Sequence, residues 1–290
     1  MTTTTPNPAT AVSAAQPNSE NRSAVAVTDV RVDAKRSIGL AETVRQSFAM
    51  GYRGLLKIRH NPEQLLDVTF MPIIFTLLFT FIFGGAISGD VHNYLPVIIP
   101  GILVQTVIMT SIVTGTQLRE DMEKGVFDRF RSLPIARISP LAGALLADVV
   151  RYLIASVITF GVGIAIGWRP SLLGAVGSVL LVLVCSFAVS WIFALMGCLL
   201  KKSSAVQGIS MLIMFPLTFA SNAFVPVETM PGWLQAFVKV NPISQLVTAV
   251  RELCGSGHAG MAVVWSLVGA VAITAVFAPL AVAAYIREAR

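Results

Sequence analysis

Long apolar runs alternate with short polar stretches along most of the chain, and this pattern predicts a protein built from membrane-spanning helices. Several of the runs exceed the roughly 18 apolar residues that indicate a span. The predicted spans cover residues 64–85, 94–116, 141–168, 172–200, 205–224 and 261–285. We therefore expect an all-α membrane protein with six transmembrane helices.

The chain before the first predicted span divides into two parts. Residues 1–35 are rich in Thr, Ala, Ser, Asn and Pro and contain no apolar block, which is typical of a disordered tail. Residues 36–60 place Leu40, Phe48 and Tyr52 on one helical face, with most charges elsewhere. This pattern predicts an amphipathic helix in the membrane interface. An ordinary juxtamembrane segment that obeys the positive-inside rule fits the same residues.

The segment Val225–Gly257, before the last predicted span, has a different pattern. One short helical piece is expected beside Pro231, with Trp233 on its apolar face, and a second is expected to begin at Asn241-Pro242. Each piece is about a dozen residues long, and a span needs about 20. The pattern therefore predicts a re-entrant or interfacial pair of helices.

The most charged part of the chain after Thr69 is the stretch Leu118–Ser139, between the second and third predicted spans. It holds five basic and four acidic residues. Its apolar residues recur at the period of one helical face: Leu118, Met122, Val126, Phe130 and Leu133. Glu120 and Lys124 have the favourable order for a helical ion pair, and Pro134 is expected to end the helix. Two interpretations fit: a solvated cytoplasmic loop, or a short helix at the membrane surface that binds a soluble partner.

Composition and charge support the membrane assignment. The chain has 290 residues, of which 55% are hydrophobic and 12% charged, against about 25% charged in soluble domains. The net charge of +6 does not indicate a nucleic-acid partner, because the basic residues cluster beside the spans. Seventeen of the 21 basic residues fall on one side of the predicted topology, which predicts that both termini and the central loop lie in the cytoplasm. We expect the membrane to be the plasma membrane.

Motifs for chemistry are absent from the sequence. There is no G-x-x-x-x-G-K-[ST], H-E-x-x-H or G-x-S-x-G, so neither a P-loop nor a common hydrolase site is expected. Cys185, Cys198 and Cys254 have no metal-site spacing, and the three histidines are scattered. No catalytic residue, cofactor or metal is expected in this chain.

Two charges fall inside the third predicted span. Asp148 and Arg151 are three residues apart, so they can pair on one face of a helix. Intramembrane charges often have a function. A self-neutralised structural pair is the alternative, and it is the interpretation favoured here. The absence of acidic and basic residues from the other span interiors argues against a proton- or sodium-coupled carrier.

Three groups of residues resemble the motifs of one family. The run Glu123–Pro134 is similar to the coupling region E-x-G-x-x-[DE]-R-x-x-x-x-P, and Ala147–Arg151 is similar to a motif early in the third span. The most specific group is Pro226, Met230, Pro231, Trp233, Asn241, Pro242, Ile243, Ser244 and Arg251. On these residues, the chain resembles the ABC-2 permeases over about residues 40–288, in particular the daunorubicin/doxorubicin-resistance exporter branch. Gln245 departs from the pattern, which has His, Tyr, Arg or Ser there.

The resemblance implies that residues 61–290 form an ABC-2 type transmembrane domain and that residues 36–60 form its connecting helix. It implies a homodimer, or a pair of related chains, bound to separate ATP-binding-cassette ATPase subunits that hold ATP and Mg. The contact with the ATPase would involve Glu120, Glu123, Lys124, Gly125, Asp128, Arg129 and Arg131. The first, second and fifth spans would line a cleft between the two permease chains of the dimer. The substrates would be amphipathic drugs, lipids or glycans.

Two other functions stay open from the residues alone. The first is an ATP-independent carrier or channel. The second is a membrane-embedded transferase, which needs a polar catalytic cluster on the outer side. Only Glu228, Arg251 and His258 are available there, and they form no recognisable set.

Overall fold

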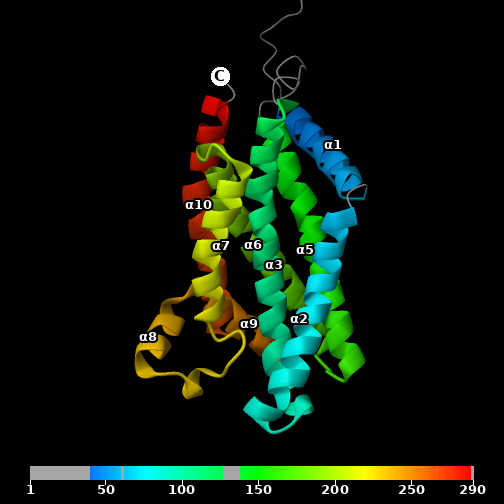
Figure 1. The fold of residues 1–290 in the computed structure, drawn as a ribbon, viewed down its shortest axis with the longest axis vertical. Coiled ribbons are helices and arrows are strands. Elements are labelled where there is room, and N and C mark those ends of the chain that lie inside the picture. Colours follow the sequence, from blue (N-terminus) through cyan, green and yellow to red (C-terminus); the bar gives the residue numbers. More distant parts are fainter. Residues whose placement is uncertain (1–39, 60–61, 127–137, 289–290) are drawn as a thin grey trace, which may run out of the picture. The chain divides into compact units, whose positions relative to one another are not determined.

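The computed structural model describes residues 40–59, 62–126 and 138–288, and within these ranges it contains helices and no strand. The all-helical class is therefore confirmed, while the predicted disordered tail lies outside the described residues. Figure 1 shows the helices, whose bounds are α1 Leu40–Arg59, α2 Pro62–Ser88, α3 Val91–Glu123, α5 Ser139–Ile166, α6 Leu172–Leu199, α7 Ser203–Phe219, α8 Gly232–Val240, α9 Pro242–Ser256 and α10 Met261–Glu288, with the short 3-10 helix η1 at Val227–Thr229.

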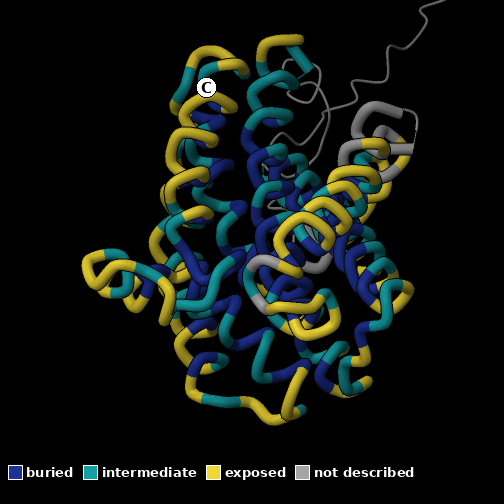
Figure 2. Tube along the Cα trace, turned by 60° about the horizontal axis from the view of Figure 1, so that its bottom comes forward, coloured by how far each residue is buried: buried dark blue, intermediate teal, exposed yellow. Residues whose placement is uncertain are grey.

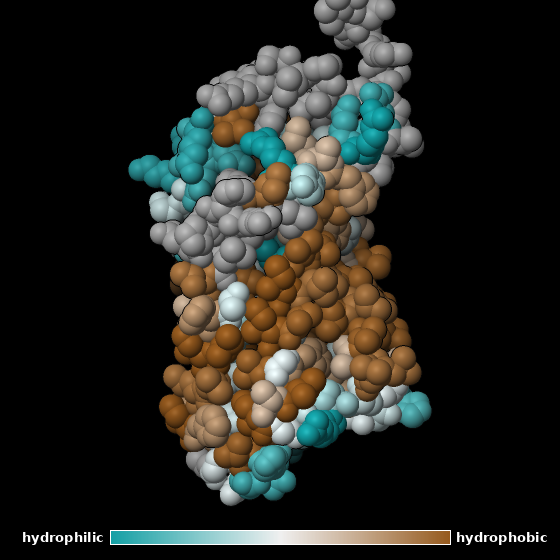
Figure 3. Space-filling view, turned by 90° about the vertical axis from the view of Figure 1, so that its right-hand side faces the viewer, coloured by the Kyte–Doolittle hydropathy of each residue, from teal (hydrophilic) through white to brown (hydrophobic). Residues whose placement is uncertain are grey.

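Five of the described helices are long and apolar enough to cross a membrane: α2, α3, α5, α6 and α10. Their exposed surfaces are rich in large apolar side chains, and Figure 3 shows a broad apolar band between polar ends on one face of the bundle. Lipid can solvate such a band, whereas water cannot. The protein is therefore a multi-pass membrane protein.

The predicted fifth span, residues 205–224, is shorter in the structure. Helix α7 has 17 residues and ends at Phe219. Its last carbonyls are capped from elsewhere, because the Asn241 side-chain amide donates to the carbonyls of Leu217, at 2.7 Å, and Ala220, at 3.2 Å. Asn241 is 24 and 21 positions away from these residues, and hydropathy does not reveal such distant contacts.

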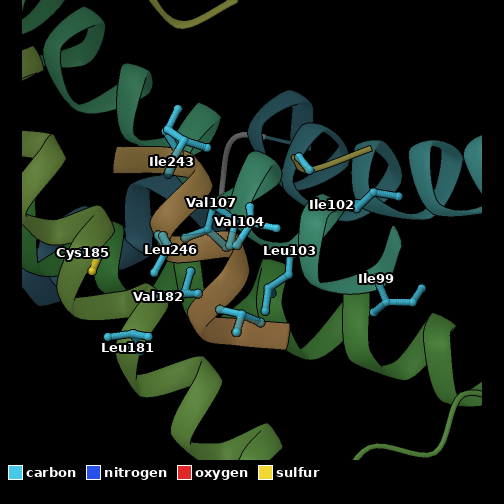
Figure 4. Packing of buried hydrophobic residues seen from close by; sticks show 14 of the residues in the cluster. Ile99, Ile102, Leu103, Val104, Val107, Leu181, Val182, Cys185, Ile243 and Leu246 are labelled. Carbon is cyan, nitrogen blue, oxygen red and sulfur yellow. The ribbon is translucent and has the colours of Figure 1, made fainter. Parts of the chain in front are cut away.

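Helix α3 is the central helix of the bundle. Most of its residues are buried, and Figure 2 shows the buried positions gathered inside the ring of outer helices. Figure 4 shows its Leu103 and Val107 packed with Val182 of α6 and Leu246 of α9. At one level α3 and α6 nearly touch, since a Cβ added to Gly115 would lie 2.2 Å from the Phe193 carbonyl oxygen. Small residues at such crossings let membrane helices approach closely.

Helix α1 confirms that residues 40–59 are helical. Its small residues Ser47 and Gly51 face α5, and a Cβ added to Gly143 of α5 would lie 2.5 Å from the Met50 Cβ. The large apolar side chains of Phe48 and Tyr52 point away from the bundle and are 63% and 65% exposed. In this helix the small residues pack against α5 and the aromatic residues are exposed, which is the reverse of an amphipathic helix in a soluble protein.

Helices α8 and α9 are the two short helical pieces expected before the last span. Asn241 caps α9 as predicted, with its Oδ1 accepting from the Ile243 N–H at 2.9 Å, and Pro242 is the first helical residue. Pro231 directly precedes α8, and Trp233 in that helix is 74% exposed. The two helices differ in burial: α9 is buried against α3 and α6, whereas α8 lies at the surface.

Candidate functional site

A cavity of about 460 Å³ lies between α2, α3 and α7. One wall is polar and belongs to α3, and the opposite walls, from α2 and α7, are mostly apolar. We call this cavity the groove, and its lining residues are Met71 and Phe75 of α2, Gln105, Thr106, Met109, Thr110, Ile112, Val113, Thr116, Gln117 and Glu120 of α3, and Gln207, Met211, Phe215 and Phe219 of α7. Its volume and mixed lining are those of a site for a small organic molecule.

The polar wall follows from the sequence of α3, where Thr106, Thr110, Gln117 and Glu120 are four, seven and three positions apart and so share one face. Thr110 and Thr116 turn their hydroxyls onto their own helix, donating to the Thr106 carbonyl at 2.8 Å and the Ile112 carbonyl at 3.2 Å. The Oε1 of Gln105 and the Nε2 of Gln117 have no hydrogen-bond partner within the described chain. These two amide atoms therefore keep unused hydrogen-bonding capacity beside the groove, whereas the threonine hydroxyls already donate to their own helix.

Stacked aromatic rings close one end of the groove. Phe79 stacks on Phe75 and on Phe224, with ring centroids 5.9 and 4.6 Å apart, and Phe219 stacks on Phe224 at 5.1 Å. The Tyr94 hydroxyl donates to the Phe224 carbonyl at 2.7 Å and holds that residue in place. Such rings bury a large apolar area with few rotatable bonds, and Phe75 and Phe219 belong to the groove lining.

Arg251 holds the backbone next to these aromatic rings. Its guanidinium donates to the carbonyls of Val97 at 2.8 and 3.1 Å, of Asn222 at 2.6 Å and of Ala223 at 3.2 Å. Burial lowers the pKa of Arg251 to about 10, which leaves it charged at neutral pH. The sequence singled out Arg251 only by resemblance; its role as a bridge between α9, α3 and the segment after α7 comes from the structure.

The predicted pair Asp148–Arg151 is confirmed. The Arg151 Nη1 lies 2.7 Å from the Asp148 Oδ1, and each side chain is no more than 3% exposed. Thr114 of α3 donates its hydroxyl to Asp148. Tyr152, the next residue after Arg151, has its hydroxyl 2.5 Å from Ser190 of α6. The sequence did not predict these contacts, which tie α5 to the groove helix α3 and to α6.

The charged end of α3 corrects one prediction. Leu118–Glu123 does not begin a separate surface helix: it is the last part of α3, which runs unbroken from Val91. The helix stops because Gly125 adopts a φ of 65°, and the N–H groups of Lys124 and Gly125 bond back to the Glu120 and Met122 carbonyls. Asp128, Arg129, Arg131 and Pro134 lie outside the described residues.

Within the described part, the charges at this end join three helices. Glu123 accepts from the backbone N–H of Ser203 at 2.7 Å and so caps the start of α7. Arg119 lies 3.7 Å from Glu123 and 3.3 Å from Glu288 at the end of α10. Glu120 pairs with Lys124 at 3.3 Å, as predicted, and also lines the groove. Of the residues predicted to bind a partner, Glu120 therefore lines the groove, and Glu123 caps α7, one of the helices that form it.

Comparisons with known proteins show which family and which relatives the chain is similar to. Residues 45–254 match the ABC-2 type transporter family. The chain is 40% identical over 240 residues to the daunorubicin resistance ABC transporter permease protein DrrB1 of Streptomyces coeruleorubidus. This alignment covers 81% of this chain and 83% of that relative. It is 27% identical over 179 residues to the probable doxorubicin resistance ABC transporter permease protein DrrC of Mycobacterium tuberculosis, over 59% of this chain and 63% of the relative.

Proposed function

The chain belongs to the ABC-2 type transporter family, and from this premise we propose that it is the membrane permease subunit of an ATP-driven exporter of amphipathic compounds. A separate ATP-binding-cassette subunit would hold ATP and Mg and hydrolyse the nucleotide. Drug-like molecules and lipids are the substrate class that the groove suits, because one wall offers amides and the others offer Phe and Met side chains.

One observation carries the proposal: the same unbroken helix lines the groove and bears the charged end. Helix α3 exposes Thr106–Gln117 to the groove and continues to Glu123 without a break. A force applied at Glu120–Lys124 therefore moves the polar wall directly. Glu123 also caps α7, so the same force reaches the apolar wall.

The partner would bind through the predicted coupling residues: Glu120, Glu123, Lys124 and Gly125, with Asp128, Arg129 and Arg131 beyond them. Charged side chains at such a contact orient a partner and set its specificity. The sum of these contacts transmits closure of the ATPase subunits to the groove.

Contacts between helix ends support six crossings of the membrane. Helices α2 and α3 form a hairpin, so the start of α2 lies at the same end as Glu123. Arg119 near that end pairs with Glu288 at the end of α10. Because α2 begins and α10 ends at the same end, the number of crossings would be even. Helix α7 with the residues after it would then be the sixth crossing, alongside the five long helices. The basic residues then place this end, and both termini, in the cytoplasm.

The remaining elements fit the same orientation. Helix α1, with open Phe48 and Tyr52, would lie in the cytoplasmic interface as the connecting helix. Helices α8 and α9 would form the outer re-entrant pair. The groove is bordered by exposed apolar residues of α2 and α7, including Phe70, Ile74, Leu212 and Phe215, which a second permease chain would cover.

Co-purification tests the proposed partnership. The tagged full-length chain is expressed in a host that also expresses the candidate ATPase, solubilised gently, and analysed for subunits bound in stoichiometric amount. We expect one ATPase for each permease chain, and loss of that ATPase when Glu120 and Glu123 are both changed to Lys. A matched Glu228→Lys/Glu252→Lys variant, with its charges near the opposite end, should retain it. A permease that purifies alone and still moves solute would establish the ATP-independent carrier instead.

A further inference from the structure

A small cavity of about 240 Å³ lies at the end of the bundle away from Glu123. Its walls are the first turns of α3, the turn between α5 and α6, and the end of α9. Figure 1 shows the α2–α3 turn and the end of α5 at the end of the bundle opposite the C-terminus. No residue lines both this cavity and the groove. Its volume is below the roughly 300–1,000 Å³ of drug-sized sites, so it suits a small group rather than a whole amphipathic molecule.

The charged side chains that line this cavity are basic. Arg169 of the α5–α6 turn and Arg251 of α9 line it together with His92 of α3, and no Asp or Glu of the described chain does. Arg169 is exposed and has no carboxylate of the described chain within ion-pair distance. Two guanidinium groups that share one small cavity repel each other, and an anion between them would turn this repulsion into attraction.

The acidic residues of the neighbouring segments do not enter the cavity. The Asp90 carboxylate accepts from the backbone N–H of His92 at 3.2 Å. Glu252 points toward the α9–α10 turn, where a Cβ added to Gly260 would lie 2.1 Å from its Oε2. Glu228 acts on Arg251 electrostatically but is not part of the lining. The positive charge of the lining is therefore not neutralised from within the cavity.

Arg251 keeps one nitrogen for this cavity. Its hydrogen bonds to the carbonyls of Val97, Asn222 and Ala223 use Nε and Nη2. Nη1 takes part in none of these bonds, and it is not one of the fully buried atoms that lack a partner in the described chain. The Nη1 donors are therefore accessible, on a side chain whose position is fixed by four other bonds.

The remaining polar groups around the cavity are already bonded or held in place. At the end of α9, the Leu253 carbonyl accepts from the Gly257 N–H at 3.0 Å, and the Cys254 carbonyl accepts from the Ser171 N–H at 3.2 Å. The His92 ring lies against the α5–α6 turn, since a Cβ added to Gly167 would lie 2.7 Å from its Cε1. The cavity thus presents donors and positive charge, while the acceptors beside it are occupied.

The cavity lies at the level of a membrane surface, because its walls include the ends of spanning helices. Helix α5 ends at Ile166 and α6 begins at Leu172. Each has 28 residues, which is about 42 Å at 1.5 Å per residue, against roughly 30 Å for the hydrocarbon core of a bilayer. The turn between them therefore lies among lipid headgroups. Leu172 and Leu173, directly after this turn, are 83% and 78% exposed, so the lipid-facing surface begins beside the cavity.

We propose that this cavity binds a phosphate-type oxyanion between the guanidinium groups of Arg169 and Arg251. Guanidinium groups bind phosphate oxygens through charge-assisted hydrogen bonds, and basic pockets between membrane helices bind lipid headgroups. The phosphate of a membrane lipid and a free phosphate ion offer the same chemistry, and the position at headgroup level favours the lipid. Under the orientation proposed above, this is a lipid of the outer leaflet. Because Arg251 also holds the backbone before Phe224, the anion would contact the side chain that positions one end of the groove.

Two binding measurements on the full-length permease in detergent test the proposal, and neither needs the ATPase. Native mass spectrometry compares the binding of phosphatidylglycerol with that of diacylglycerol, which lacks the phosphate. The melting temperature is also compared in sodium phosphate and in sodium chloride at equal ionic strength. We expect tighter binding of phosphatidylglycerol than of diacylglycerol. A rise in melting temperature with sodium phosphate would identify the free ion as a ligand of the same site.

Substitutions in the lining separate charge from shape. Arg169→Gln removes an exposed cation and should weaken binding of phosphatidylglycerol about fivefold. Gly255→Glu places a carboxylate in the lining, which should pair with the guanidinium groups and abolish binding. Gly255→Gln, of the same size but neutral, should retain most of the binding. A Cβ added to Gly255 would meet no atom within 4 Å, so both variants should fold.

The matched control is Arg45→Gln, which removes an exposed arginine of α1 outside this cavity and should bind phosphatidylglycerol like the natural chain. Three results would overturn the proposal. Equal binding of phosphatidylglycerol and diacylglycerol, with no effect of sodium phosphate, would show that no oxyanion binds. Unchanged affinity in both Arg169→Gln and Gly255→Glu would place any binding elsewhere. Equal losses in Gly255→Glu and Gly255→Gln would show that shape, and not charge, governs the cavity.

Discussion

Replacing Asp148 by Leu should strongly destabilise the bundle, and the size of the effect follows from the contacts of the carboxylate. Asp148 is buried, pairs with Arg151 at 2.7 Å and accepts from the Thr114 hydroxyl. Its loss leaves the buried guanidinium without its carboxylate, which costs about 3–5 kcal/mol in comparable pairs. Thr114→Val removes only one hydrogen bond to the charged group and should cost about 1.5–3 kcal/mol.

The double variant Asp148→Leu/Arg151→Met separates a structural pair from a functional one. Replacing both charges by apolar groups of similar size is often neutral or stabilising, so the free energy of unfolding should return to within about 1 kcal/mol of the natural value. A purely structural pair predicts that ATP-driven transport returns as well. Transport that stays lost in a fully stable double variant would show a functional role.

The assay is unfolding in mixed micelles, followed by circular dichroism, with transport measured on the same preparations. The two single variants and the double variant are compared with the natural chain. An Asp148→Leu protein that unfolds within about 1 kcal/mol of the natural chain would refute the reasoning. It would mean that Arg151 is accommodated without its carboxylate.

Other predictions concern the groove and the helix contacts around it. Glu123→Gln should weaken the cap on α7 by about 1 kcal/mol and lower permease-stimulated ATPase activity without unfolding the bundle, as read by calorimetry and phosphate release; unchanged stimulation would contradict the coupling role. Arg251→Met leaves three carbonyls without their donor and should lower the free energy of unfolding by about 3 kcal/mol or more, as measured in the same micelles. Gly115→Ala should prevent close packing of α3 on α6 and reduce the folded yield, whereas Gly161→Ala, a matched exposed glycine, should not. Gln117→Leu should change the apparent affinity for transported compounds and leave stability unchanged, because the Nε2 of Gln117 has no hydrogen-bond partner in the described chain.

The sequence predicted most of the helical architecture and less of its connections. Hydropathy located the five long helices because burial in lipid requires about 20 apolar residues in a row. It placed the end of α7 too late, since that end depends on the Asn241 side chain, which comes from a distant part of the chain. The sequence also predicted that a separate helix begins at Leu118. In the structure α3 continues through Leu118 to Glu123, because charged residues are readily accommodated in a helix once it has left the membrane.

The site shows the same division between local and distant information. The pairs Asp148–Arg151 and Glu120–Lys124 were predicted because they obey helical spacing. Thr114 beside Asp148, and Ser203 beside Glu123, join residues 34 and 80 positions apart, and no local period encodes them. The signal for the groove was the placement of Thr106, Thr110, Gln117 and Glu120 on one face of α3, and hydropathy averages such a signal away.

Transport in proteoliposomes tests the central claim most directly. The permease is reconstituted with its ATPase partner, and uptake of a fluorescent amphipathic compound is measured with ATP and Mg, with a non-hydrolysable analogue, and without nucleotide. The account predicts uptake only with hydrolysable ATP, and its loss in Glu123→Gln while both subunits remain assembled. Uptake that continues without nucleotide, or without the ATPase, would contradict the account and identify an independent carrier.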